Sequence, residues 1–97
     1  MDFVCYMIYS HSLNRYYVGH TSDFAERLKK HNDGYFGNKA FTSRAQDWEE
    51  FLVIPCSSVE LAVYLEIKIK RMKSRSYKEN LKKYPEMINK IIQEFYV

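Results

Sequence analysis

The first hydrophobic segments of the chain have the composition of β-strands. Residues 4–9 and 16–19 are rich in the aromatic and β-branched residues that favour strands. Residues 11–15 between them are typical of a turn. The pattern therefore predicts an antiparallel β-hairpin.

The hydrophobic period changes to that of a helix after Gly19. Residues 21–23 (Thr-Ser-Asp) offer N-cap oxygens, Phe24 and Leu28 form an apolar stripe, and residues 32–34 supply a C-terminal stop. These signals predict a short helix. Residues four apart share a face beside its apolar stripe, and here they are Asp23, Arg27 and His31.

The second half of the chain predicts another strand and a long helix. Residues 47–56 carry a continuous apolar run that ends at Pro55, which is expected of a central strand and would complete a three-stranded sheet with the hairpin. Ser57 or Ser58 then caps a helix, and Ser57 with Glu60 fits a capping box. The core-facing stripe of that helix is Leu61, Leu65, Ile69 and Met72.

Two further segments flank these elements. Residues 34–45 have no clean period and predict an irregular loop, whose aromatic and basic residues can contact nucleic acid or can simply pack onto the core. Pro85 suits the first turn of a last helix that packs against the sheet. Its stripe is Met87 or Ile88, Ile91, Ile92 and Phe95.

Composition adds a basic region to this picture. The chain has 97 residues, 46% of them hydrophobic, which predicts one domain over residues 1–97. Its formal net charge is only +3, yet residues 66–83 contain eight Lys or Arg against two Glu. The cations at helical spacing there are Lys68, Arg71, Arg75, Lys78 and Lys82. This face suits a polyanion, and a solvated charged face is the alternative.

Cysteine usage and hydropathy point to the cytoplasm. Cys5 and Cys56 lie in apolar, strand-like segments without Cys-x-x-Cys spacing, so we expect buried, reduced thiols. No apolar run approaches the roughly 20 residues of a membrane span, and the N-terminus is not a signal peptide. We therefore expect a cytoplasmic protein with no membrane partner.

One carboxylate stands out on the long helix. Glu66 lies just off the apolar stripe, so its side chain can point into the groove between helix and sheet. An ordinary exposed glutamate has the same spacing. The pattern alone leaves both interpretations open.

The motifs together resemble the GIY-YIG nuclease family, in particular its small stand-alone bacterial members. Residues 4–6 (Val-Cys-Tyr) stand where the family has Gly-Ile-Tyr, and residues 17–19 (Tyr-Val-Gly) stand where it has Tyr-Ile-Gly. Residues 19–32 follow its helix pattern, and residues 64–70 look like its metal-site helix. The order and separation of these motifs make the chain similar to the nuclease domain of excision-repair and homing endonucleases.

The resemblance implies an α+β fold, with a three-stranded antiparallel sheet flanked by helices in the order β-β-α-β-α-α. It implies Mg²⁺- or Mn²⁺-dependent cleavage of DNA phosphodiester bonds, in repair or recombination. The implied catalytic residues are Tyr6, Tyr17, Arg27, His31 and Glu66, with Glu66 as the metal ligand. The implied nucleic-acid-binding residues are His20, Lys39, Arg44, Lys68, Arg71, Arg75 and Lys78.

Elementary chemistry agrees with these roles. A divalent cation held by one carboxylate can offset charge on phosphoryl oxygens. Arg27 can form a planar fork on a phosphate. Tyr17, with Tyr6 beside it across the hairpin, is the matching group for the attacking water, either as a base or as a group that only positions the water.

Two other functions remain open at this stage. A nucleic-acid-binding module could keep the scaffold and the basic helix without useful catalysis. A protein-interaction domain could instead use the aromatic residues Tyr35, Phe36 and Phe41 to contact a partner. For a nuclease of this size, we expect DNA targeting to need a homodimer, a partner protein or the loop itself.

Overall fold

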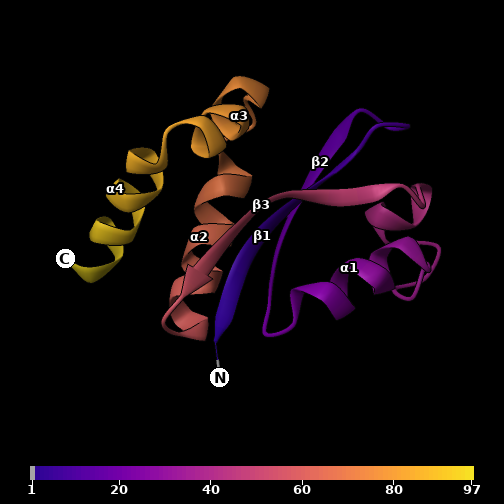
Figure 1. Cartoon of the computed structure of the whole chain (residues 1–97), viewed down its shortest axis with the longest axis horizontal. Helices are drawn as coiled ribbons and strands as arrows, with labels where there is room; N and C mark the ends of the chain where they lie inside the picture. Colours follow the sequence, from indigo (N-terminus) through magenta and orange to yellow (C-terminus); the bar gives the residue numbers. More distant parts are fainter. Residues whose placement is uncertain (1) are drawn as a thin grey trace.

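Three antiparallel strands form the middle of the computed structural model, which describes residues 2–97, and helices cover both faces of the sheet (Figure 1). The strands are β1 (Phe3–Ser10), β2 (Arg15–Thr21) and β3 (Trp48–Cys56). The helices are α1 (Phe24–Asn32), the 3₁₀ helix η1 (Phe41–Arg44), α2 (Val59–Arg71), α3 (Arg75–Lys83) and α4 (Pro85–Tyr96). The predicted α+β class and the hairpin are confirmed.

The sheet has the order β2-β1-β3, so β1 is central and β3 is an edge strand. The prediction that residues 47–56 form a central strand is therefore wrong. The apolar run of β3 arises because both of its faces are covered, with Leu52 and Ile54 in one cluster and Val53 in the other. Pro55 is tolerated at an edge, where its missing N–H breaks no ladder.

The two faces of the sheet pack against different elements. Helices α2, α3 and α4 cover one face, whose buried residues include Cys5, Met7, Val18, Leu61, Leu65, Ile69, Leu81 and Ile91. Helix α1 and η1 cover the other face, whose buried hydrophobic residues are Tyr6, Ile8, Ala45 and Trp48. Both cysteines are buried and free, as expected. No described helix is long and apolar enough to cross a membrane.

The predicted long helix is two helices. Helix α2 ends at Arg71, Met72 is 42% exposed, and Ser74 caps α3 by accepting a hydrogen bond from the Tyr77 N–H. The apolar stripe of α2 therefore stops at Ile69. The structure therefore has one more α-helix than expected, and the segment predicted as an irregular loop, residues 34–45, contains the 3₁₀ helix η1.

The starts of α2 and α4 agree only in part with the prediction. Ser58 caps α2, whereas the Ser57 hydroxyl bonds to the Tyr96 hydroxyl, so the predicted capping box of Ser57 and Glu60 is wrong. Helix α4 begins at Pro85 as predicted. It packs mainly against α2 and α3 and less against the sheet.

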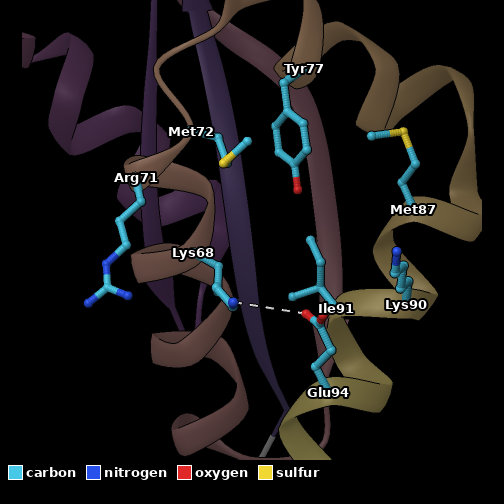
Figure 2. A pocket seen from close by; sticks show the side chains of 8 residues that line it. All are labelled: Lys68, Arg71, Met72, Tyr77, Met87, Lys90, Ile91 and Glu94. Carbon is cyan, nitrogen blue, oxygen red and sulfur yellow. Dashed lines mark ion pairs between the residues drawn. The ribbon is translucent and has the colours of Figure 1, made fainter.

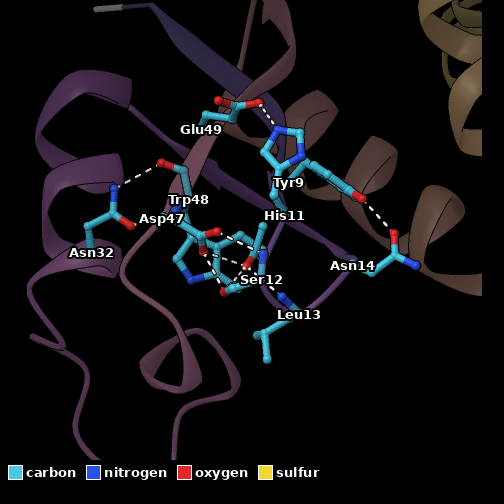
Figure 3. A network of polar contacts seen from close by, with 10 residues as sticks. Tyr9, His11, Ser12, Leu13, Asn14, Asn32, Asp47, Trp48 and Glu49 are labelled. Atoms are coloured by element: carbon cyan, nitrogen blue, oxygen red, sulfur yellow. Dashed lines mark hydrogen bonds and ion pairs between the residues drawn. The ribbon is translucent and has the colours of Figure 1, made fainter.

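A polar network fixes the hairpin turn to the start of β3 (Figure 3). The Asp47 carboxylate accepts hydrogen bonds from the Ser10 hydroxyl at 2.6 Å and from the N–H and hydroxyl of Ser12 at 2.8 and 2.9 Å. Those bonds lower the pKa of Asp47 to about 2. Asn32 at the end of α1 holds the Trp48 backbone through both its amide N–H and its amide oxygen. These bonds hold the hairpin turn and the end of α1 at the start of β3.

Candidate active site

A pocket of about 180 Å³ opens at the free edge of β2. Because β2 is an edge strand, side chains from both faces of the sheet reach this pocket. Its lining is Tyr6, Tyr17, Gly19, His20, Arg27 and Glu66. The fold thus brings together four of the five residues predicted as catalytic, and His20 joins them.

The fifth predicted residue, His31, lies behind the pocket. Its side chain is only 3% exposed, so it belongs to the core side of α1 and does not stand beside the apolar stripe as the sequence suggested. Its Nε2 and the Tyr6 hydroxyl share a hydrogen bond of 2.8 Å, and its Nδ1 and the Thr42 hydroxyl share one of 2.7 Å. A chain of buried polar groups therefore runs from η1 through α1 to β1.

Burial sets the protonation of this chain. It lowers the pKa of His31 to about 4, helped by the nearby Arg27 charge. It raises the pKa of the Tyr6 hydroxyl well above its ordinary value. At neutral pH the pair is therefore a neutral imidazole and a neutral phenol, held at fixed positions.

Gly19 makes room for the Tyr6 ring. The two residues are directly paired across the hairpin, and a Cβ built on Gly19 would lie 2.5 Å from the Tyr6 hydroxyl oxygen and 2.7 Å from Cζ. Neither distance is acceptable for real atoms. Glycine at the end of the second motif is thus required by the close approach of the tyrosine of the first motif.

Tyr17 and Arg27 stand at the boundary between this pocket and a second hollow of about 210 Å³ on the η1 side. The Tyr17 ring lies 6.5 Å from the Phe41 ring and 5.1 Å from the His31 ring. The Arg27 guanidinium lies 5.2 Å above the Phe36 ring. Within residues 2–97 Arg27 has no carboxylate at ion-pair distance, so its charge is available to an anionic substrate.

Glu66 is held by two donors. His20 Nδ1 donates to its Oε1 at 2.6 Å, and Lys70 Nζ donates to its Oε2 at 2.7 Å. Burial raises the pKa of Glu66, but the hydrogen bonds from Lys70 and His20 outweigh this effect, and the pKa lies below its ordinary value. The Glu66 side chain is 18% exposed, so the ionised carboxylate is partly buried and still reaches the pocket.

The donor set at Glu66 fits Mg²⁺ or Mn²⁺. Mg²⁺ keeps several waters and needs only one or two protein carboxylates. Across residues 2–97 no group of three His, Cys, Asp or Glu side chains is close enough to form a protein-only cage. Glu66, with free lone pairs on both oxygens, is the carboxylate that lines the pocket.

Sequence reasoning missed two residues of this site. Lys70 pairs with Glu66 one helical turn away, and the i, i+4 spacing of opposite charges could have indicated it. Its Nζ also lies 5.5 Å from the centre of the Tyr17 ring. Thr42 fixes His31 from η1, eleven residues away, and no local pattern could have indicated it.

The predicted nucleic-acid-binding residues do not form one face, because the predicted long helix is interrupted between α2 and α3. Lys68 and Arg71 line a cavity of about 390 Å³ between α2, α3 and α4, where Lys68 lies 4.0 Å from Glu94 (Figure 2). The rest of that lining is Met72, Tyr77, Met87, Lys90, Ile91 and Glu94. Arg75 and Lys78 line a different hollow beside β2.

The loop before β3 divides its aromatic residues between core and solvent. Phe41 packs against the Tyr6 cluster, Phe36 lines the hollow beside Arg27, and Tyr35 is 67% exposed. Lys39 is exposed, and the exposed Arg44 places its guanidinium 5.5 Å from the Phe41 ring. Phe41 therefore packs onto the core, whereas contact of the exposed residues with nucleic acid stays a prediction.

Comparison with known proteins shows the family of the chain. Residues 2–82 match the family model of the GIY-YIG catalytic domain. The solution NMR structure of a UPF0213 protein from Bacillus halodurans is 27% identical, with a TM-score of 0.51, over 84% of this chain and 82% of that chain. No curated protein matches the chain. Since the family match spans most of the sequence and includes both motifs around the β2 pocket, the chain belongs to the GIY-YIG nuclease family.

Proposed function

We propose that this protein is a metal-dependent endonuclease that hydrolyses DNA phosphodiester bonds, in DNA repair or recombination. The observation that carries the proposal is the pocket at the edge of β2, which gathers Tyr6, Tyr17, Arg27 and Glu66 around one space of about 180 Å³. A cation, a carboxylate and two phenols around one small space are suited to a phosphodiester.

Arg27 is the group that binds the phosphate. Its guanidinium has a planar fork of N–H donors that matches two phosphate oxygens. Packing over the Phe36 ring orients the side chain without using those donors. The positive charge opposes the negative charge that grows on phosphoryl and leaving oxygens during hydrolysis.

Glu66 is the group that holds the metal. A divalent cation held there would keep waters in the rest of its shell and would supply positive charge that offsets the charge on the phosphoryl oxygens. His20 and Lys70 fix the orientation of the carboxylate and keep it ionised. Both are positioning residues in this proposal.

Tyr17 is the group that orients the attacking water. Its hydroxyl makes no hydrogen bond within residues 2–97, whereas the Tyr6 hydroxyl is occupied by His31. Tyr6 therefore marks the inner wall of the pocket with a fixed polar group, and Tyr17 is the phenol that can take a water.

A second candidate function rests on the ion pair between Lys70 and Glu66. Lys70 already places a positive charge 2.7 Å from the carboxylate and competes with a metal ion for Oε2. A chain in which this pair persists would bind nucleic acid without cutting it.

The test compares the wild type with Glu66→Gln and Tyr17→Phe on supercoiled, single-stranded and branched DNA, with Mg²⁺, with Mn²⁺ and with chelator. We expect cleavage only with metal, its loss in Glu66→Gln, and a much larger fall in turnover than in DNA affinity for Tyr17→Phe. Glu50→Gln, which removes an exposed carboxylate on β3, is the matched control and should cut normally. DNA binding without cleavage under every condition would establish the binding module instead.

A further inference from the structure

A second positively charged hollow lies next to the hairpin turn. It has a volume of about 260 Å³. Four cations line it together with Tyr16, and we call them the hairpin cluster: Arg15, Lys73, Arg75 and Lys78. They come from the start of β2, from the link between α2 and α3, and from α3 itself.

The charges of the hairpin cluster are not neutralised within the described part of the chain. None of the four cations has a carboxylate within 4.0 Å, because every ion pair there involves other residues. The nearby Glu79 carboxylate accepts a hydrogen bond from the Tyr16 hydroxyl at 3.0 Å. Like charges gathered around one hollow repel one another, and a bound anion removes that cost.

Two of the four cations are held in place by the hairpin and by the end of α2. Arg75 donates to both the side-chain and the backbone oxygen of Asn14, and its guanidinium lies 5.4 Å from the Tyr16 ring. Asn14 has φ +53°, a left-handed conformation that asparagine tolerates. Lys78 Nζ donates to the Met72 carbonyl at 2.9 Å. Each cation keeps further N–H donors for a ligand.

The hairpin cluster and the β2 pocket are joined by one line of contacts. Along the edge of β2, His20 contacts Glu66, Tyr17 contacts Lys70, and Tyr16 contacts Arg75. Helix α2 thus runs antiparallel to β2, and the first residue of α3 lies beside the start of β2. From His20 back to Arg15 the strand spans about 17 Å. The hairpin cluster therefore lies within reach of a phosphate only a few nucleotides from a bond held at the β2 pocket.

We propose that the hairpin cluster binds a backbone phosphate of DNA a few nucleotides to one side of the bond that is cleaved. The proposal rests on the nuclease function proposed above, and it adds a direction to it. Because the cluster lies at one end of β2 only, the enzyme needs intact DNA backbone on one side of the cleavage point and not on the other.

The binding test is made without cleavage, in chelator, with a duplex of about three helical turns. The variant is Arg15→Ala/Lys73→Ala, because these two exposed cations do not hold α3 to the hairpin. Lys83→Ala/Lys90→Ala removes the same charge from α3 and α4 and is the control. We expect the cluster variant to weaken binding about tenfold and to lower the slope of log affinity against log salt by about 1. Equal behaviour of the two variants overturns the proposal.

The cleavage test uses end-labelled duplexes with metal. We expect the wild type to leave a few nucleotides uncut at one end of a strand only, and the cluster variant to lose that asymmetry. Symmetric ends in the wild type overturn the inference while the nuclease function stands. If nothing is cut, the nuclease function fails, and the salt dependence in chelator still decides whether the hairpin cluster binds phosphate.

Discussion

The two faces of the sheet differ in what they bury. The face under α2, α3 and α4 is filled by aliphatic side chains and two thiols. The face under α1 and η1 buries a smaller hydrophobic cluster together with His31 and Thr42, and the Trp48 indole N–H donates to the Thr42 carbonyl at 2.8 Å. Hydrophobic burial has no direction, whereas hydrogen bonds fix one geometry. One face therefore supplies most of the stability, and the other positions the chemistry.

The candidate pocket lies where the two faces meet. At the free edge of β2, Tyr6 and Arg27 enter the pocket from the face under α1 and η1, which we call the polar face. His20 and Glu66 enter it from the face under α2, α3 and α4. An edge strand makes this possible, since a central strand would keep the two faces apart. The difference between the faces can be tested with neighbouring residues that point in opposite directions.

The largest effect is expected at Leu65, one residue before Glu66 on α2. The Leu65 side chain is fully buried, so Leu65→Ala should lower the free energy of unfolding by about 2–5 kcal/mol. Glu66→Gln should change that free energy by less than about 1 kcal/mol, because the Lys70 partner is exposed, and should abolish cleavage. Urea unfolding and a cleavage assay on both variants make the comparison. If Glu66→Gln is more destabilising than Leu65→Ala, the assignment of stability to Leu65 and of catalysis to Glu66 is wrong.

The next effect is expected at Gly19. In Gly19→Ala the new Cβ pushes the Tyr6 ring away from its place, and displacement of a site group by about 1 Å costs about 100-fold in turnover. Val18 points to the opposite face and is buried there, so Val18→Ala should lower stability and leave turnover intact. Turnover and thermal unfolding of the two variants are measured side by side. Normal turnover in Gly19→Ala would mean that the position of Tyr6 does not matter.

Local patterns were sufficient for the elements but not for how they meet. Strand composition and cap residues predicted the hairpin, and α1 with its Asp23 cap. The edge position of β3 was missed because burial on two faces looks the same at an edge and in the centre. The break after α2 was missed because neither proline nor glycine marks it; Ser74 is its only local signal.

The candidate site shows the same limit. The family motifs named four side chains that the fold brings into one pocket. The bonds that orient them depend on residues far apart in sequence, such as Thr42 with His31 and His20 with Glu66. Spacing along one helix placed His31 on an open face, whereas the packing of η1 and Phe36 against it decides its burial.

A third effect concerns pH and belongs to the polar face. Burial lowers the pKa of His31 from its ordinary value of 6.5 to about 4. Between these two values the unfolded chain binds more protons than the folded one, so stability falls as the pH falls from 6.5 toward 4. We expect His31→Gln to remove about 3 kcal/mol of this dependence, measured by urea unfolding at several pH values. A variant with the same pH dependence as the wild type would show that the imidazole is not neutral in the fold.

The smallest effect is expected at Asp47, an exposed group whose pKa, like that of the buried His31, is lowered in the fold. The Asp47 carboxylate accepts hydrogen bonds from Ser10 and Ser12, and these bonds lower the pKa of Asp47 to about 2. The contribution of the carboxylate to stability is therefore present above the ordinary pKa of 3.8 and is lost as the pH falls toward 2. Asp47→Asn should therefore lower the melting temperature slightly at pH 7 and by less at pH 2. Glu50→Gln on β3 removes a carboxylate with no ion pair within residues 2–97. Its difference in melting temperature from the wild type should therefore be the same at pH 7 and at pH 2. If the difference in melting temperature between Asp47→Asn and the wild type stays constant from pH 7 to pH 2, the shape of the Asp47 side chain and not its charge fixes the turn.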